Sequence, residues 1–162
     1  MRKTIISVIS LEKNSHLQKR IILKLLKESG LKGWSCTGVS TIYGLEGNLF
    51  ADDILRAERE LFCDPVIEIC AVQAKPKNGF IFADVWYRSG VTDPASESIL
   101  KALMDLKINS IQNAHSGTRY KFVNKNLFFY RRPREKQKLI KFVTQNLLNP
   151  LIQECSLTSY DC

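Results

Sequence analysis

Several features that mark enzymes are missing from this 162-residue chain. It has only two histidines, His16 and His115, and neither has a partner at metal-ligand spacing. No glycine-rich phosphate-binding loop of either standard spacing occurs. No Ser/His/Asp or Cys/His arrangement is recognisable, and we interpret His115 as a turn residue. The sequence therefore predicts no catalytic residue, no metal site and no cofactor. The acidic side chains that come closest to a cluster are interpreted as solvated helix faces: Asp52, Asp53, Glu58 and Glu60.

Long apolar runs are also missing. None approaches the roughly 20 residues that a membrane-spanning helix needs. The apolar stretch that follows Met1-Arg2-Lys3 is short and is interrupted by Ser7 and Ser10, so it does not fit a signal peptide. We therefore expect a cytoplasmic protein that does not enter a membrane.

The cysteine pattern indicates neither a disulfide framework nor a zinc site. The chain has five cysteines, an odd number, and no C-x-x-C spacing. Cys63, Cys70 and Cys155 lie in apolar runs. We predict that these three are small core residues.

What the chain does have is a recurring junction. Leu61-Phe62-Cys63-Asp64-Pro65-Val66-Ile67-Glu68 is echoed 85 residues later by Leu147-Leu148-Asn149-Pro150-Leu151-Ile152-Gln153. Proline cannot continue a helix and pushes the preceding residue towards extended geometry. Each junction is therefore predicted to be a helix exit followed by a strand.

Upstream matches extend this echo. Thr41–Leu45 matches Thr118–Phe122 at an offset of 77, and Ile22-Leu23-x-x-Leu26 matches Ile99-Leu100-x-x-Leu103 at the same offset. The offset grows to 85 near residues 129–134, which indicates an insertion of about seven residues before the last helix. Matches in one order at nearly one offset predict a duplicated unit.

Each half is predicted to run β-α-β-β-α-β. In the first half we expect strands at 4–11, within 34–45 as a hairpin around Gly38, and at 66–72, with helices at 15–29 and from residue 52 or 53. In the second half we expect strands at 80–88, 108–114, 118–123 and 151–157, with residues 127–130 as an extension of the third. We also expect one helix capped by Asp93-Pro94 and another that ends before Asn149.

The predicted fold class is α+β. Each unit would form an antiparallel sheet with both helices on one face. The two sheets would then pack through their open faces as a pseudo-dimer within one chain, monomeric on its own. The expected division is 1–74 for the first repeat, 75–79 for the linker and 80–162 for the second repeat.

Basic charge is concentrated in one stretch. The net charge is +8, and residues 119–141 contain nine basic side chains opposed only by Glu135. Arg119 and Tyr120 begin a predicted strand. They fit either an edge-strand pair with a solvated Arg or a contact with a partner protein, since Arg and Tyr are favoured at interface anchors.

Four segments together resemble the PurS subunit of phosphoribosylformylglycinamidine (FGAM) synthase. They occur in the family's order, and the similarity covers nearly all of residues 1–157, being closer in the second half. The N-terminal domain of the long PurL form of that enzyme is similar to two PurS units in one chain. The segments are Gly90-Val91-Thr92-Asp93-Pro94, Leu100-x-x-Leu103 with Leu106-Lys107-Ile108, Ser116-Gly117-Thr118-Arg119-Tyr120, and Leu147-Leu148-Asn149-Pro150-Leu151-Ile152.

This resemblance implies a role in purine biosynthesis. The family enzyme uses ATP and ammonia released from glutamine; PurL binds ATP and substrate, PurQ is the glutaminase, and PurS has no catalytic residues but holds the other two together. It implies a non-catalytic assembly subunit with a PurL-like synthetase and a PurQ-like glutaminase as partners. We expect the partner contacts at Asp93, Pro94, Arg119, Tyr120, Arg131, Arg132 and Arg134.

An alternative is a nucleic-acid-binding α/β module. Phe128, Phe129 and Tyr130 stand beside Arg131 and Arg132 within the basic-aromatic patch 119–141. Aromatic rings next to arginines can stack bases. No RNA-recognition signature accompanies them, and the assembly subunit is the favoured interpretation.

Overall fold

The fold is α+β, as predicted. The computed structural model describes residues 2–10, 14–48, 50–72, 74–77, 79–125 and 132–159. The elements run in the order β1 (Arg2–Ser10), α1 (Asn14–Glu28), β2 (Trp34–Gly47), α2 (Ala51–Ala57), the π-helical turn η1 (Glu58–Phe62), β3 (Glu68–Val72), β4 (Phe80–Tyr87), α3 (Ser96–Asp105), β5 (Ile111–Asn124), α4 (Pro133–Asn146) and β6 (Gln153–Ser159).

All six strands belong to one antiparallel sheet, in the order β3-β1-β2-β5-β4-β6. The two halves are joined edge to edge, because β2 pairs with β5 along nearly its whole length. The prediction of two sheets packed through their open faces is therefore wrong. The physical reason is that β2 and β5 are the longest strands, and pairing them satisfies two rows of backbone donors and acceptors that would otherwise be exposed.

Each predicted hairpin is instead one continuous strand. Residues 34–45 lie within β2, and residues 111–123 lie within β5, with no turn at His115-Ser116-Gly117. The two residues of a tight hairpin turn usually need a positive φ. Neither Gly38 nor Gly117 has one, whereas Gly30, Gly47, Gly79 and Gly90 do. Gly38 marks a register shift in the ladder rather than a chain reversal.

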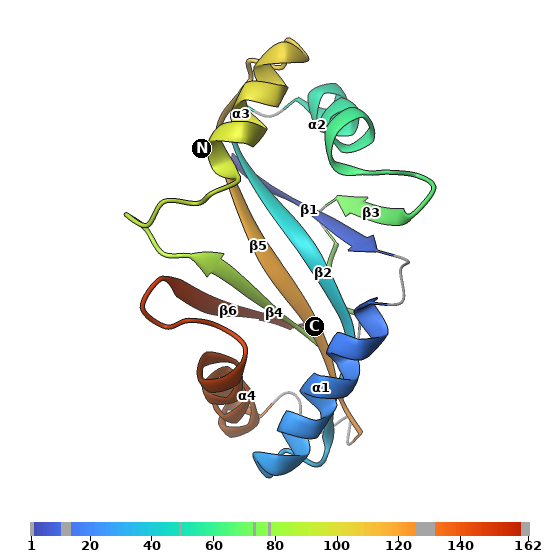
Figure 1. Cartoon of the computed structure of the whole chain (residues 1–162), viewed down its shortest axis with the longest axis vertical. Helices are drawn as coiled ribbons and strands as arrows, with labels where there is room; N and C mark the ends of the chain where they lie inside the picture. The colour runs from blue at the N-terminus through green and yellow to red at the C-terminus, as the bar shows by residue number, and fades with distance from the viewer. Residues whose placement is uncertain are drawn as a thin grey trace.

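Helices cover one face of this sheet, in two pairs. Figure 1 shows α1 and α4 near one end of the molecule and α2 and α3 near the other. The cluster under α1 and α4 is made of Ile22, Leu26, Leu31, Trp34, Cys36, Ile81, Ala83, Val85, Phe122, Leu139, Phe142 and Val143. The cluster at the other end is made of Ile6, Val8, Leu45, Ala57, Phe62, Ile99, Leu103, Ile108, Ile111 and Ala114.

Several element boundaries differ from the predictions. α3 begins at Ser96 rather than beside Asp93, and β3 and β6 begin after the Asx-Pro turns rather than within them. The predicted extension at 127–130 and the first half of the predicted insertion at 129–134 lie outside the described residues, as does Asn78 of the predicted linker. Among the described residues, no helix has the length and apolar character needed to cross a bilayer.

Candidate functional site

The face of the sheet opposite the helices carries a layer of aromatic and cationic side chains. β4 contributes Phe80, Phe82 and Trp86 to this layer, since alternate residues of a strand share a face. A cation lies over each ring: Lys121 Nζ is 4.2 Å from the Phe80 centroid, Arg119 Cζ is 4.5 Å from Phe82, and Lys3 Nζ is 5.0 Å from Trp86. Such contacts are favourable and hold the cations flat against the sheet.

Arg119 makes a buried ion pair within this layer. Its Nε and Nη2 donate to the two carboxylate oxygens of Asp84, each at 2.6 Å. Arg119 is 5% exposed and Asp84 is 2% exposed. A third nitrogen, Nη1, lies 3.5 Å from the carbonyl oxygen of Ala74, in the connection from β3 to β4. That connection therefore crosses the helix-free face of the sheet and helps to cover the ion pair.

The Gly90–Pro94 segment forms a tight loop between β4 and α3. The Val91 N–H donates to the Arg88 carbonyl at 3.0 Å, and Gly90 has φ +83°. This is the arrangement in which a type II turn favours glycine. Asp93 ties the loop to β5, because one carboxylate oxygen accepts from the Ala95 N–H at 2.9 Å and from the Ser116 hydroxyl at 2.8 Å, and the other accepts from the Ser116 N–H.

The same loop touches the turn that precedes β6. The Arg88 N–H donates to the Ile152 carbonyl at 3.0 Å, and Arg88 Nε donates to the Gln153 carbonyl at 3.1 Å. The chain just before segment 90–94 is thus hydrogen-bonded to the last residue of segment 147–152, although the two are far apart in the sequence. Leu151 at the tip of the turn is 83% exposed.

A groove of about 320 Å³ opens beside this loop, and we refer to it as the motif groove. On the helix-free face of the sheet, Lys3 Nζ lies 3.5 Å and His115 Nε2 lies 3.8 Å from Glu46 Oε1. The arrangement offers charges of both signs around an indole ring. It is suited to contact with a polypeptide surface. The groove is lined by Lys3, Trp86, Tyr87, Arg88, Ser89, Gly90, Val91, Asp93, His115 and Glu154.

The structure brings the predicted partner residues together only in part. Asp93 lines the motif groove and is buried, whereas Pro94 is exposed and is not part of the lining. Arg119 faces the opposite side of β5 from Tyr120, which packs in the α1–α4 core and donates its hydroxyl to the Leu147 carbonyl at 3.4 Å. Burial raises the pKa of the Tyr120 hydroxyl. Neither residue lies on an edge strand, so the edge-strand interpretation with a solvated Arg119 is wrong.

The basic residues after β5 form a separate region. Arg132 is the N-cap of α4, Arg134 is exposed in its first turn, and Arg131 lies outside the described residues. Their role in partner binding remains a prediction. Within the described part of the chain, no group of three or more His, Cys, Asp or Glu side chains is placed to hold a metal ion.

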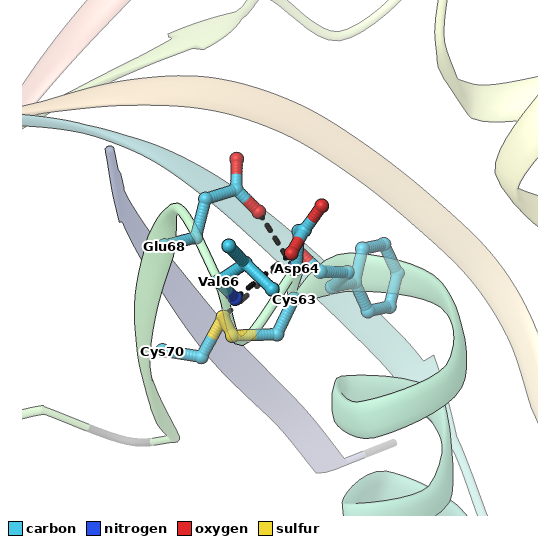
Figure 2. Close-up of a disulfide and its surroundings, with 6 residues drawn as sticks. Cys63, Asp64, Val66, Glu68 and Cys70 are labelled. Carbon is cyan, nitrogen blue, oxygen red and sulfur yellow. Dashed lines mark hydrogen bonds between the residues drawn. A yellow bond between two sulfur atoms is a disulfide. The ribbon is translucent and has the colours of Figure 1, made fainter. Parts of the chain in front are cut away.

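The two Asx-Pro turns share one hydrogen-bond pattern. In the first, Asp64 Oδ1 accepts from the Val66 N–H at 2.9 Å and the Asp64 N–H donates to Glu68 at 3.0 Å; both bonds are drawn in Figure 2. In the second, Asn149 Oδ1 accepts from the Leu151 N–H at 3.1 Å and the Asn149 N–H donates to Gln153 at 3.0 Å. Val66, the counterpart of Leu151, is 81% exposed.

A disulfide that the sequence analysis missed spans the first of these turns. Figure 2 shows Cys63 and Cys70 bonded across it, with their Cα atoms 6.0 Å apart. The prediction that both are small core thiols is wrong, because η1 ends and β3 begins at points that bring the two side chains together. A signal was present in the sequence: two cysteines flank an Asp-Pro turn, and a turn returns the chain beside itself.

Comparison with known proteins adds no identification. The chain matches no protein-family model, and no curated protein shows significant sequence similarity to it.

Proposed function

We propose that this chain is a non-catalytic assembly subunit of FGAM synthase, formed by two PurS-like repeats in one polypeptide. It would bridge a PurL-like synthetase and a PurQ-like glutaminase in the cytoplasm and aid the transfer of ammonia between them. The observation that carries this proposal is that segment 90–94 lines the motif groove, while Arg88, just before that segment, is hydrogen-bonded to Ile152 of segment 147–152. The groove offers charged groups of both signs around the Trp86 indole, a mixture that suits a protein contact.

The symmetry of the chain supports the repeat part of the proposal. Thr41 pairs with Thr118 at the centre of the β2·β5 ladder, and these residues are 77 apart, the offset found in the sequence. On either side, Ser40 pairs with Arg119 and Ile42 pairs with Gly117, which are equivalent pairs at the same offset. A two-fold axis through the Thr41·Thr118 pair would therefore exchange the halves. This is the arrangement expected of a fused dimer.

Reconstitution tests the proposal. The purified chain is mixed with a PurL-like synthetase that lacks its own PurS-like region and with a PurQ-like glutaminase. We expect glutamine-dependent FGAM synthesis to rise when the chain is added, while synthesis driven by free ammonia is unchanged. If the glutamine-dependent rate is the same with and without the chain, the proposal fails.

A pair of matched variants tests the contact surface. Leu151→Asp places a charge at the exposed tip of the turn before β6 and should reduce the glutamine-dependent rate about tenfold or more, the loss typical of a disrupted interface anchor. Val66→Asp makes the same change in the turn with the same hydrogen bonds at the other edge of the sheet, where no Gly-Val-x-Asp-Pro loop adjoins it. It should retain the rate. If Leu151→Asp and the unaltered chain supported equal rates, the turn that carries Leu151 would not be part of the contact surface.

A further inference from the structure

A further cavity lies at the end of the molecule away from the motif groove. It measures about 630 Å³, within the roughly 300–1,000 Å³ of small-molecule sites. It is enclosed by the end of α1, the start of β2, the end of β5 and one face of α4. Its lining residues are Ser29, Gly30, Leu31, Gly33, Trp34, Asn124, Lys125, Glu135, Lys138, Lys141, Phe142 and Gln145.

The equivalent position at the opposite end of the β2·β5 ladder carries a larger residue than the cavity end. Ser110 precedes β5 as Gly33 precedes β2. At that end the Ser110 hydroxyl donates to the Asp53 carboxylate of α2. At the cavity end, the equivalent position is Gly33, which has no side chain that could contact α4. The cavity lies between Gly33 and α4. A Cβ on Gly33 would lie 3.4 Å from Asn124 Oδ1, so a small side chain fits there without displacing the backbone.

The cavity wall is rich in hydrogen-bond donors. Lys125, Lys138 and Lys141 supply three ammonium groups against a single carboxylate, that of Glu135. Lys138 Nζ lies 2.6 Å from Glu135 Oε1. Lys138 is the main cause of a lowered pKa of the Glu135 carboxyl, which is therefore ionised at neutral pH. Two positive charges remain in excess.

One donor in the wall is buried without an acceptor. Trp34 is 2% exposed, and its indole N–H makes no hydrogen bond. It lies near enough to Glu135 to contribute to the lowered pKa of that carboxyl, but it is not in hydrogen-bond geometry. Burying such a group unsatisfied costs about 1–3 kcal/mol. The indole nitrogen itself is inaccessible, so this group bears on the stability of the wall and not on contact with a ligand.

The rest of the wall is apolar. Leu31, Trp34 and Phe142 are buried side chains of the α1–α4 core that reach the cavity. A bare inorganic ion would leave this surface uncovered. From this combination we propose that the cavity binds a small organic phosphate, with the phosphate at the lysines and the organic group against Leu31 and Phe142. The proposal does not depend on the proposed function.

Fluorescence of Trp34 gives a direct test. The chain has two tryptophans, so Trp86→Phe leaves Trp34 as the only indole. Ribose 5-phosphate and AMP are the probes, and ribose and adenosine are the matched controls without phosphate. We expect a saturable change of Trp34 emission with the phosphates alone, confirmed by calorimetry on the unaltered chain. No saturable signal with either phosphate up to about 5 mM would overturn the proposal, since weaker binding is worth less than about 3 kcal/mol.

Variants locate the binding. Lys125→Met and Lys141→Met should each weaken it about five- to tenfold, because a hydrogen bond to a charged group contributes roughly 1.5–3 kcal/mol and exposure reduces that value. Lys101→Met, on exposed α3, is the control and should change nothing.

The lysines could instead serve only to stabilise the negative C-terminal end of the α1 dipole. In that case the phosphates would produce no fluorescence signal. Binding that survives both Lys125→Met and Lys141→Met in a folded protein, judged by circular dichroism, would place the phosphate elsewhere and contradict the proposal.

Discussion

Asp84 and Arg119 show how a charged residue can belong to the interior of a sheet. Asp84 stands within Phe80–Tyr87, otherwise the most apolar strand of the chain. A buried carboxylate needs a cation and hydrogen bonds, and Arg supplies both through its planar fork. The lone acidic residue in β4 was thus a signal for a buried partner. Sequence alone did not say that the partner is Arg119, because β4 and β5 pair across a helix.

Removing one member of this pair should be costly. We expect Arg119→Met to lower the free energy of unfolding by about 3–5 kcal/mol, because Asp84 would remain as an uncompensated buried charge. The double variant Asp84→Leu with Arg119→Met should recover most of that loss. Urea unfolding followed by circular dichroism measures both.

An exposed ion pair is the control for this prediction. Arg56 lies 2.9 Å from Glu60 on the surface of the helix. Arg56→Met should cost less than about 1 kcal/mol, as exposed pairs do. If Arg119→Met were equally mild, Asp84 and Arg119 would not act as a buried pair.

Lys107 stands where the other half of the chain has a glycine. Its φ is +59°, and it ends α3 as Gly30, with φ +76°, ends α1. The bonds are equivalent: Leu31 N–H to Leu26 C=O at 2.8 Å, and Ile108 N–H to Leu103 C=O at 2.9 Å. A left-handed conformation costs a non-glycine residue about 1–2 kcal/mol.

Lys107→Gly should therefore stabilise the protein. The gain should be about 0.5–1 kcal/mol, since glycine gives back part of the relief through its greater freedom when unfolded. Lys101→Gly makes the same substitution inside α3 and should cost about 1 kcal/mol. Thermal unfolding of the two variants should thus shift in opposite directions, and a lower melting temperature for Lys107→Gly would contradict the assignment.

At the scale of elements, the sequence predicts helices better than strand continuity. The helices were found because their apolar spacing and their Gly or Asx-Pro ends are local signals. β2 was divided because its alternation breaks at Gly38. A turn and a β-bulge both break a period of two, and only tertiary pairing distinguishes them. Here the register shift between Cys36 and Gly38 lets Cys36 and Val39 face the same core.

The disulfide stabilises one turn of a matched pair. Leu148 and Cys155 occupy the positions of Cys63 and Cys70 in the second turn, which keeps its hydrogen bonds without a covalent link. The bond therefore adds stability rather than creating the turn. Disulfides are rare in reducing compartments. The protein should therefore be more stable in an oxidising environment, where this bond persists, than in a reducing one.

Replacing both bridging cysteines should lower stability without changing the fold. Cys63→Ser with Cys70→Ser should cost up to about 2.5 kcal/mol, from the loop-closure entropy of so short a segment. Dithiothreitol should destabilise the unaltered chain by a similar amount and leave the double variant unchanged. Burial raises the pKa of the Cys36 thiol to about 11, so Cys36 should resist alkylation in both proteins near neutral pH. If the double variant were as stable as the unaltered chain without dithiothreitol, the bond would be absent in solution.

At the scale of the whole molecule, the offset of 77 residues predicted that the two halves are related by symmetry. It did not predict the surface through which the two halves join. Open faces were expected to pack because a sheet with helices on one side leaves the other exposed. In the structure that face is occupied by the cation-aromatic layer and by the connection containing Ala74. Those contacts depend on residues distant in sequence, which is why periodicity could not reveal them.

Trp86 closes this layer over the seam between the halves. A Cβ placed on Gly117 of β5 would lie 2.8 Å from the Trp86 ring and 2.5 Å from the Val85 carbonyl oxygen. A Cβ on Gly44 of β2 would lie 3.4 Å from the same ring. The indole therefore spans both central strands, and its close approach to β5 requires a residue without a Cβ at position 117.

Gly117→Ala should test whether the seam depends on that close approach. The added methyl group meets backbone as well as the ring, so the strands must separate or the indole must move, at a cost of about 1–3 kcal/mol. Gly38→Ala is the matched control in the same ladder: its Cβ would lie 3.6 Å from the Lys121 side chain, an ordinary contact, and stability should change by less than about 0.5 kcal/mol. Urea unfolding measures the difference, and Trp86 emission in a Trp34→Phe background reports its cause. A red shift with Gly117→Ala alone means that water has reached the indole at the seam, whereas equal stability and equal emission in both variants would mean that Trp86 does not join the two halves.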